Sequence, residues 1–220
     1  MRKNLTEIVF ILDRSGSMAG LESDTIGGYN ALIAKQKKEA GEAIISTVLF
    51  DDMCEVLHDR KDLVKIEPLT EEDYYVRGCT ALLDALGVTI HHIGNVHKYA
   101  REEDRPEKTL FIITTDGMEN SSRHYSYDQV KRMVECQKEK YGWEFLFLGA
   151  NIDAVAEAQR FGIRSDRAVN YHADCEGTAV NYRALSKAVS SVRKCEDMDC
   201  LEEALCGWDE EIREDYKSRK

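Results

Sequence analysis

Proline is scarce in this chain of 220 residues, which contains only two. Long Pro-rich linkers are therefore excluded, and the length suggests a single domain. Long apolar runs are missing as well, because no stretch of about 18 apolar residues occurs that would span a membrane. Hydrophobic residues still make up 43% of the sequence and charged residues 32%. This composition is typical of a soluble globular protein with one sizeable core.

Paired cysteine motifs and an export signal are also lacking. The seven cysteines are an odd number, and no two of them form a Cys-x-x-Cys motif. The apolar run at 8–12 is too short for the hydrophobic region of a signal peptide, and no small-residue cleavage site follows it. We therefore expect reduced thiols and a cytoplasmic location, as in a bacterial intracellular protein.

Positive charge is outnumbered, with 30 lysines and arginines against 41 aspartates and glutamates and a net charge of −11. Such a chain repels the phosphate backbone, so we expect no nucleic-acid partner. The acidic residues are partly concentrated between 196 and 215, a pattern typical of a solvated helix face. No Gly-x-x-x-x-Gly-Lys-Ser/Thr motif is present, so any ATP chemistry would belong to a partner.

Short apolar runs alternate with segments of helical periodicity, which indicates an α/β fold. We expect a Rossmann-like three-layer sandwich, with helices on both faces of a mostly parallel six-stranded sheet. One short hairpin adds an antiparallel edge strand. Residues 1–194 are expected to form this domain, and residues 195–220 an acidic helical extension packed on it. The sequence predicts strands at 7–12, 43–50, 54–58, 108–115, 144–148 and 167–171, and helices at 21–40, 80–99, 126–140, 153–161, 177–194 and 199–217.

Polar residues stand at the ends of two buried strands and at the start of one helix. Asp13, Ser15 and Ser17 follow the first strand, Asp116 follows a later strand, and Thr80 opens a helix. Ligands of open parallel sheets bind outside the carboxyl ends of the strands, so we expect these side chains to converge there. Carboxylate and hydroxyl oxygens are hard ligands that suit Mg²⁺, by preference, or Mn²⁺ or Ca²⁺, and not zinc. Two carboxylates only balance a 2+ charge, which leaves the ion with an affinity for a further anion.

These segments resemble the metal-ion-dependent adhesion site (MIDAS) of von Willebrand factor A (VWA) domains. Residues 13–17 read Asp-Arg-Ser-Gly-Ser and resemble its first segment, Asp-x-Ser-x-Ser. Residues 79–82 are similar to the second segment, in which a threonine begins a helix, and residues 115–117 to the third. All five ligand positions are present in order, as in an intracellular bacterial VWA domain with an intact MIDAS. One departure is Cys79, where members of the family often have glycine.

The resemblance implies that Ser15, Ser17 and Thr80 touch the metal directly and that Asp13 and Asp116 act largely through water. It also implies a sixth position for water or for a carboxylate of a partner protein. The chain would then be a non-enzymatic, metal-dependent protein-interaction module that captures an acidic side chain. Some similar proteins work in operon-encoded assemblies with an ATPase or kinase.

An alternative from another class is a Mg²⁺-dependent phosphohydrolase of haloacid-dehalogenase-like architecture. Those enzymes also begin with an aspartate after the first strand, but they place a second aspartate two residues later, where this chain has Ser15. No nucleophile–base pair is visible either, because no histidine is assigned beside Ser15 or Ser17. We therefore favour a binding protein over an enzyme.

Several other polar groups have a functional and a structural explanation. Asp51 and Asp52 could bind a cation, but a hairpin turn accounts for them. Glu119 and Asn120 could touch a ligand, but we favour a plain surface turn. We favour ordinary helix residues for His91, His92 and His97. A zinc site is conceivable for Cys175, Cys195, Cys200 and Cys206 with His172, but we favour buried thiols.

Overall fold

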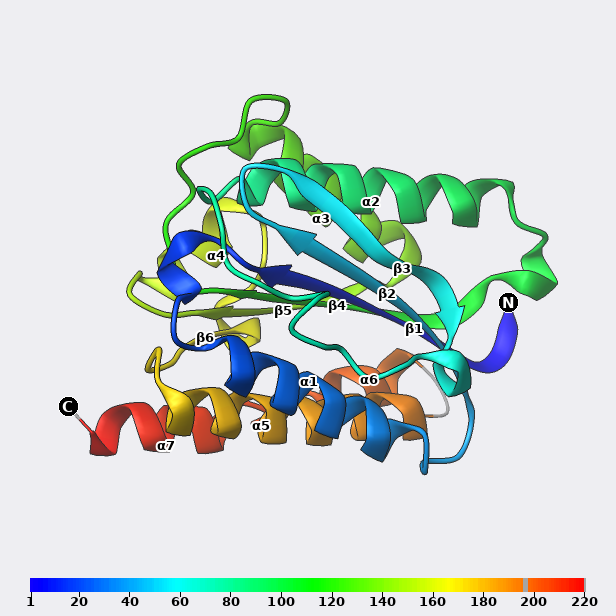
Figure 1. The fold of residues 1–220 in the computed structure, drawn as a ribbon. Coiled ribbons are helices and arrows are strands. Elements are labelled where there is room, and N and C mark those ends of the chain that lie inside the picture. The colour runs from blue at the N-terminus through cyan, green and yellow to red at the C-terminus, as the bar shows by residue number, and fades with distance from the viewer. Residues whose placement is uncertain (196–197, 220) are drawn as a thin grey trace.

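A six-stranded sheet lies at the centre of the computed structural model, which describes residues 1–195 and 198–219 (Figure 1). The strand order is β3-β2-β1-β4-β5-β6. Neighbouring strands pair in parallel except β2 and β3, which are antiparallel. The predicted sheet, with its antiparallel edge strand, is confirmed. Its strands are β1 (Arg2–Asp13), β2 (Glu42–Phe50), β3 (Cys54–Asp62), β4 (Pro106–Thr115), β5 (Glu144–Gly149) and β6 (Ala168–Asn170).

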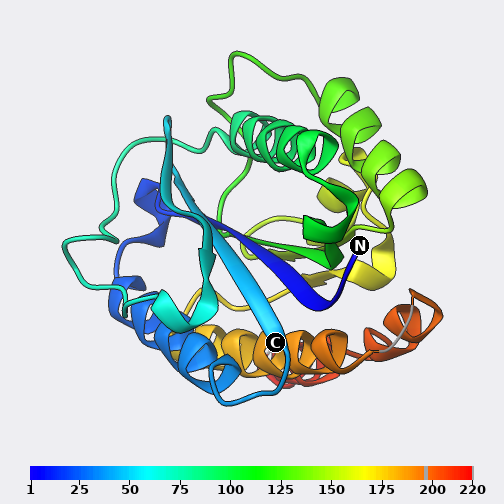
Figure 2. The same cartoon turned by 90° about the vertical axis from the view of Figure 1, so that its right-hand side faces the viewer.

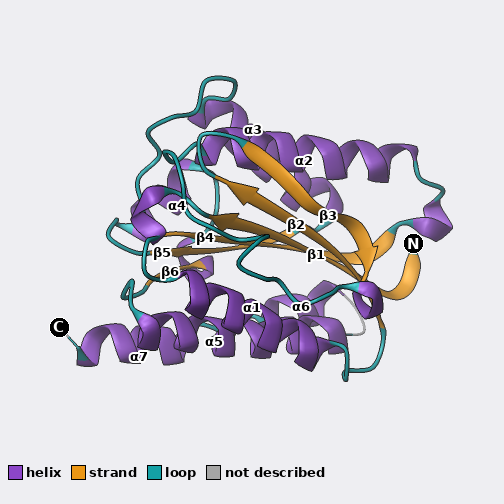
Figure 3. Ribbon diagram, viewed as in Figure 1, coloured by secondary structure: helices purple, strands orange, loops and turns teal. Residues whose placement is uncertain are grey.

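Helices cover both faces of this sheet, as Figures 2 and 3 show. One face is covered by α1 (Glu22–Gln36), α5 (Cys175–Lys194), α6 (Met198–Ala204) and α7 (Glu210–Ser218). The other is covered by α2 (Leu82–Tyr99), α3 (Tyr127–Tyr141) and α4 (Ala154–Arg160). Among the described helices, none has the length and hydropathy needed to span a bilayer.

The buried side chains of β1 alternate between the two faces, as the period of two of a strand requires. Phe10 and Leu12 pack toward α1 and α5, whereas Val9 and Ile11 pack toward α2 and α3. Because β1 is buried on both faces, it reads as a continuous apolar run, the signal from which the strand was predicted. Because β1 ends at Asp13, the residues that follow lie at the carboxyl edge of the sheet.

The ends of α3 and α4 follow from local chemistry. Ser126 caps α3 in a capping box with Gln129, and Gly142 ends that helix in the left-handed region at φ 65°. Gly162, at φ 79°, follows the end of α4. Gly142 thus directly precedes the approach to β5, and Gly162 begins the connection from α4 to β6.

The prediction of one helix over 199–217 is wrong, because two helices, α6 and α7, occupy this stretch. Gly207 lies between them at φ 65°, a conformation that interrupts a right-handed helix. Trp208 then turns inward, and its Nε1 donates to the carbonyl of Asp166 at 3.0 Å. In α7, the buried side chain of Ile212 belongs to the core on the α5 side of the sheet. The division at residue 195 stays a prediction, and residues 196–197 and 220 lie outside the described residues.

Candidate metal site

The carboxyl ends of β1 and β4 form the edge at which the site residues meet. The strand order reverses between these neighbours, since β1 leads to β2 on one side and lies beside β4 on the other. Such a switch point is where open α/β sheets bind ligands. Asp13 is the last residue of β1, and Asp116 directly follows β4. Thr80 comes from the loop before α2, which lies beside the same edge (Figure 1).

The five predicted site residues come together in one hydrogen-bonded group. Thr80 Oγ1 donates to Ser15 Oγ at 3.1 Å, and the Ser15 and Ser17 hydroxyls lie 3.1 Å apart. Ser17 Oγ donates to Asp116 Oδ1 at 2.5 Å, and Ser15 N donates to Asp13 Oδ1 at 2.7 Å. The convergence predicted from the sequence is therefore what the fold produces, across three separate segments of the chain.

Asp13 is fully buried at the base of this group. Burial raises the pKa of its carboxyl to about 6, although hydrogen bonds from Thr115 and Ser15 oppose that shift. Its Oδ2 accepts a hydrogen bond of 2.6 Å from Thr115 Oγ1. These hydrogen bonds orient the carboxylate but bring no positive charge to it.

Asp116 is also buried, and burial again raises the pKa of its carboxyl against the hydrogen bond from Ser17. The negative charge of Asp116 in turn contributes to the raised pKa of Asp13. Within the described residues, no lysine or arginine pairs with either carboxylate. The two carboxylates are buried without a cationic partner, so a bound cation would offset their mutual repulsion and their loss of hydration.

Gly117 leaves room for the hydroxyls of the site. A Cβ at this position would lie 3.2 Å from Ser17 Oγ and 3.3 Å from Thr80 Oγ1. Glycine therefore keeps open a space between the segments that carry Asp116, Ser17 and Thr80. Ser17 is itself exposed while Ser15 and Thr80 are buried, so the group opens to solvent on one side.

The donor set consists of oxygen atoms, which suits a hard divalent cation. Nowhere in the described part of the chain do three His, Cys, Asp or Glu side chains gather as a metal site. The hydroxyls are therefore required to complete any coordination at Asp13 and Asp116. These oxygens fit Mg²⁺, Mn²⁺ or Ca²⁺ better than a softer ion.

Several residues that support the site were not expected from the sequence. Besides Thr115, the hydroxyl of Tyr74 donates to the backbone carbonyl of Asp13 at 2.5 Å. The prediction of a plain surface turn at Glu119 and Asn120 is wrong, because Asn120 Oδ1 accepts from Thr80 N at 3.0 Å and Glu119 Oε2 from Leu83 N at 2.9 Å. Both residues hold the segment that carries Thr80.

The Asp51-Asp52 segment forms the expected hairpin turn, but Asp51 has a further role. Its buried carboxylate accepts hydrogen bonds from Arg14 Nε at 2.8 Å and Arg77 Nε at 2.7 Å. Burial raises the pKa of Asp51, but the hydrogen bonds from Arg77, the Met53 amide and Arg14 outweigh that effect and hold it below its usual value. Asp51 is thus neutralised by arginines, in contrast to Asp13.

His91, His92 and His97 all lie in α2 as predicted, and two of them contact carboxylates. His97 Nε2 lies 2.5 Å from Glu7 Oε2, and His92 Nε2 lies 2.8 Å from Asp59 Oδ1. Glu7 is buried and also accepts from Arg60 Nε at 2.8 Å. These contacts lie away from the carboxyl edge and belong to the packing of α2 on the sheet.

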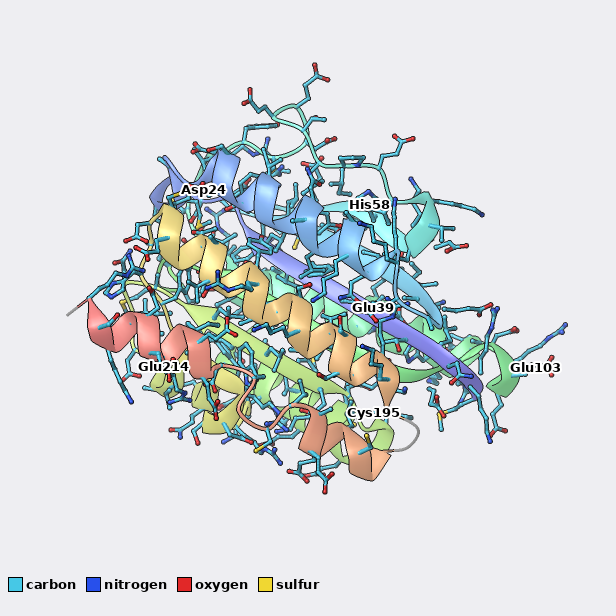
Figure 4. All side chains as sticks on the ribbon, turned by 90° about the horizontal axis from the view of Figure 1, so that it is seen from below. Asp24, Glu39, His58, Glu103, Cys195 and Glu214 are labelled. Carbon is cyan, nitrogen blue, oxygen red and sulfur yellow. The ribbon has the colours of Figure 1, made fainter. Side chains whose placement is uncertain are left out.

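The C-terminal cysteines are spread out, so they form no zinc site within the described residues. Cys175 begins α5 and donates to Asp24 at 3.2 Å, whereas Cys195 follows the other end of that helix (Figure 4). Cys195 and Cys200 Sγ lie 2.9 Å apart. The expectation of buried thiols is wrong for Cys175 and Cys206, which are exposed.

Comparisons with known proteins agree with this fold. No protein-family model and no curated protein sequence matches the chain. Among solved structures, proximal thread matrix protein 1 from the mussel byssus, with a zinc-occupied MIDAS motif, is similar with a TM-score of 0.58 and 16% identity, over 86% of this chain and 46% of that one. Its crystal form 2 gives a TM-score of 0.56 and 18% identity, over 84% and 46%. A von Willebrand factor type A protein from Catenulispora acidiphila gives 0.54 and 16%, over 84% and 43%.

This chain therefore spans less than half the length of each of these structures. At such low identities the likeness concerns the fold alone. The fold is that of a von Willebrand factor A domain, as the resemblance of the three segments predicted.

Proposed function

We propose that this chain is a metal-dependent protein-interaction module without catalytic activity of its own. A divalent cation, Mg²⁺ by preference, would be held by Asp13, Ser15, Ser17, Thr80 and Asp116. The observation that carries the proposal is the pair of buried carboxylates with raised pKa, joined to three hydroxyls at the switch point of the sheet.

The choice of metal rests on the chemistry of the donors. Proximal thread matrix protein 1 has a zinc-occupied MIDAS motif, so a divalent ion is compatible with a fold of this kind. The five proposed donors are all oxygen atoms, with no nitrogen or thiolate among them, which favours Mg²⁺ or Mn²⁺, with Ca²⁺ as the larger alternative. The bound ion would supply a Lewis-acidic centre at the surface.

The partner would contribute an anion. The three hydroxyls are neutral and the two carboxylates would act largely through water, so the ion would keep an open, electrophilic position that a further carboxylate can fill. The exposed Ser17 marks the side from which such a group would approach. A bacterial cytoplasmic setting and an assembly with an ATPase or kinase stay predictions from the sequence.

A phosphohydrolase is the less supported alternative. The residue two positions after Asp13 is Ser15, whose hydroxyl bonds to Ser17 and Thr80 and to no histidine of the described residues. No base is therefore placed to activate it. Turnover of an aryl phosphate with Mg²⁺ that disappears in Asp13→Ala would overturn the proposal of a binding role.

Mn²⁺ binding followed by electron paramagnetic resonance tests the metal claim. We expect one Mn²⁺ per wild-type chain, displaced by Mg²⁺, and no binding by Asp13→Ala or by the milder variant Ser17→Ala. Asp128→Asn, on the exposed start of α3, is the matched control and should bind as the wild type does. Pull-down on immobilised wild-type protein, with Mg²⁺ or with EDTA, then tests partner capture, and proteins retained equally with EDTA or by Asp13→Ala would contradict it.

A further inference from the structure

The loop that follows Asp116 is fastened to the first turn of α2 by the carboxylate of Glu119. Its Oε2 accepts from Leu83 N at 2.9 Å and from Ser122 Oγ at 2.8 Å. Its Oε1 accepts from Ser121 N at 2.9 Å and Ser122 N at 2.8 Å. An ionised carboxylate offers about four acceptor sites, so these four donors fill it.

Glu119 is well matched to this position. Leu83 is the second residue of α2, a helix of 18 residues, so the carboxylate lies at the positive end of the helix dipole. It also satisfies an amide that the helix itself leaves without a partner. A negative side chain is therefore stabilised here, and it accepts from donors on both segments at once.

The backbone of Thr80 is held by the same loop. Asn120 Oδ1 accepts from Thr80 N at 3.0 Å, and Asn120 N and Ser121 N donate to Thr80 O at 3.0 and 3.2 Å. Ser121 N thus bonds to both Glu119 and Thr80. The place of the Thr80 hydroxyl relative to Asp116 is consequently set by the conformation of residues 119–122.

We propose that Glu119 is a positioning residue of the metal site, which holds Thr80 at the separation from Asp116 that the ion requires. This inference rests on the function proposed above. Thr80 precedes α2 and Asp116 follows β4, so their spacing depends on the junction that Glu119 makes. Residues that orient metal ligands in this way commonly change metal affinity about 10- to 100-fold when they are replaced.

Asp84 provides a matched control on the same junction. Its carboxylate accepts from the amides of Arg123, His124 and Tyr125, each at 2.9 Å, and so holds the far end of the loop. Within the described part of the chain, its carboxylate has no hydrogen bond with Thr80. Asp84→Asn should therefore lower the thermal stability and leave the affinity for metal within about twofold of the wild type. Glu119→Gln should lower both the thermal stability and the affinity for metal.

The test compares the Mn²⁺ dissociation constants of wild type, Glu119→Gln, Asp84→Asn and Asp13→Ala by electron paramagnetic resonance, with circular dichroism to establish folding. Glutamine has the size of glutamate, but its amide group would face backbone donors. We expect about 10- to 100-fold weaker binding in Glu119→Gln. Binding within about twofold of the wild type, or an equal loss in Asp84→Asn, would overturn the role of Glu119.

The controls separate this proposal from the one on which it rests. If wild type binds Mn²⁺, Asp13→Ala does not and Glu119→Gln does, only the positioning role fails. If wild type itself binds none, the proposed function fails and the positioning role with it. Should Glu119→Gln not fold, Ser122→Ala removes one donor to Glu119 and should weaken binding by a smaller factor, and unchanged binding would overturn the inference.

Discussion

Thr115 Oγ1 donates a 2.6 Å hydrogen bond to Asp13 Oδ2, and it joins the last residues of two neighbouring parallel strands. The two residues are 102 positions apart in the chain. The bond fixes the carboxylate at the base of the site and opposes the rise in its pKa that burial causes. The orientation of Asp13 thus depends on the end of β4 as much as on its own loop.

Thr115→Val should therefore weaken metal binding while it keeps the shape of the side chain. We expect Mn²⁺ affinity to fall about 10- to 100-fold, because a group that orients a metal ligand is lost. Loss of a hydrogen bond to a buried carboxylate should also lower the free energy of unfolding by about 1–3 kcal/mol without metal. Calorimetric titration and urea unfolding measure the two effects. Thr109→Val, on the same strand but away from the site, is the control, and equal affinity of both variants would contradict this role.

The buried Arg14 should be one of the strongest single contributors to stability near the site. It is fully buried against Asp51, at 2.8 Å, and its replacement leaves that carboxylate with only part of its neutralising charge. We expect Arg14→Met to lower the free energy of unfolding by about 3–5 kcal/mol in urea. Arg77→Met removes the more exposed partner of the same carboxylate and should cause a smaller loss. A larger loss of unfolding free energy in Arg77→Met than in Arg14→Met would show that Asp51 depends mainly on Arg77.

Two glycines should respond to alanine with opposite signs. Gly207 has φ 65°, and a Cβ there would lie 2.7 Å from Glu210 Oε1, so Gly207→Ala should destabilise by about 1 kcal/mol. Gly27 lies inside α1 with no atom within 4 Å of an added Cβ, so Gly27→Ala should stabilise by about 1 kcal/mol. Thermal unfolding of the two variants measures both. Destabilisation by Gly27→Ala would mean that α1 needs a glycine for another reason.

Metal affinity should depend on pH through Asp13. Its pKa in the folded chain is about 6, above the ordinary value of 3.8, so the metal-free folded protein binds more protons than the unfolded chain between these values. Asp13 therefore lowers stability as the pH rises from about 4 to 6, and a cation competes with the proton. We expect Mn²⁺ affinity about tenfold weaker at about pH 5 than at about pH 7.5. In metal-free protein at about pH 7.5, Asp13→Asn should raise the melting temperature. A lower melting temperature would contradict the claim that the ionised Asp13 carboxylate destabilises the fold.

Much of the fold could be predicted from local patterns. Buried parallel strands are continuous apolar runs, and the period of α2 is visible in its leucines and isoleucines. The segment 199–217 was misjudged because its apolar period continues across Gly207, and only the left-handed backbone there shows that the helix ends. A glycine inside a periodic segment does not reveal from sequence whether it is left-handed, since Gly27 stands within α1.

The site was predictable where its chemistry is local. Asp13, Ser15 and Ser17 lie within five residues, and Thr80 and Asp116 each adjoin a recognisable element. The supporting residues were missed because their partners are distant: Arg14 reaches Asp51 over 37 positions and Glu119 reaches Leu83 over 36. A buried arginine and a surface arginine look alike in a sequence, and so do a capping glutamate and one in a plain turn.

The position of a bound ion tests the account most directly. Crystals grown with Mn²⁺ and measured at its absorption edge should show one anomalous peak, bounded by the oxygens of Ser15, Ser17 and Thr80 and adjacent to Asp13 and Asp116. Ligand distances of about 2.0–2.3 Å to the hydroxyls would identify direct coordination. Crystals of Asp13→Ala should lack the peak. Absence of density at this place in wild-type crystals at saturating Mn²⁺, or a peak at another acidic group such as Glu7 or Asp51, would contradict the proposed metal site.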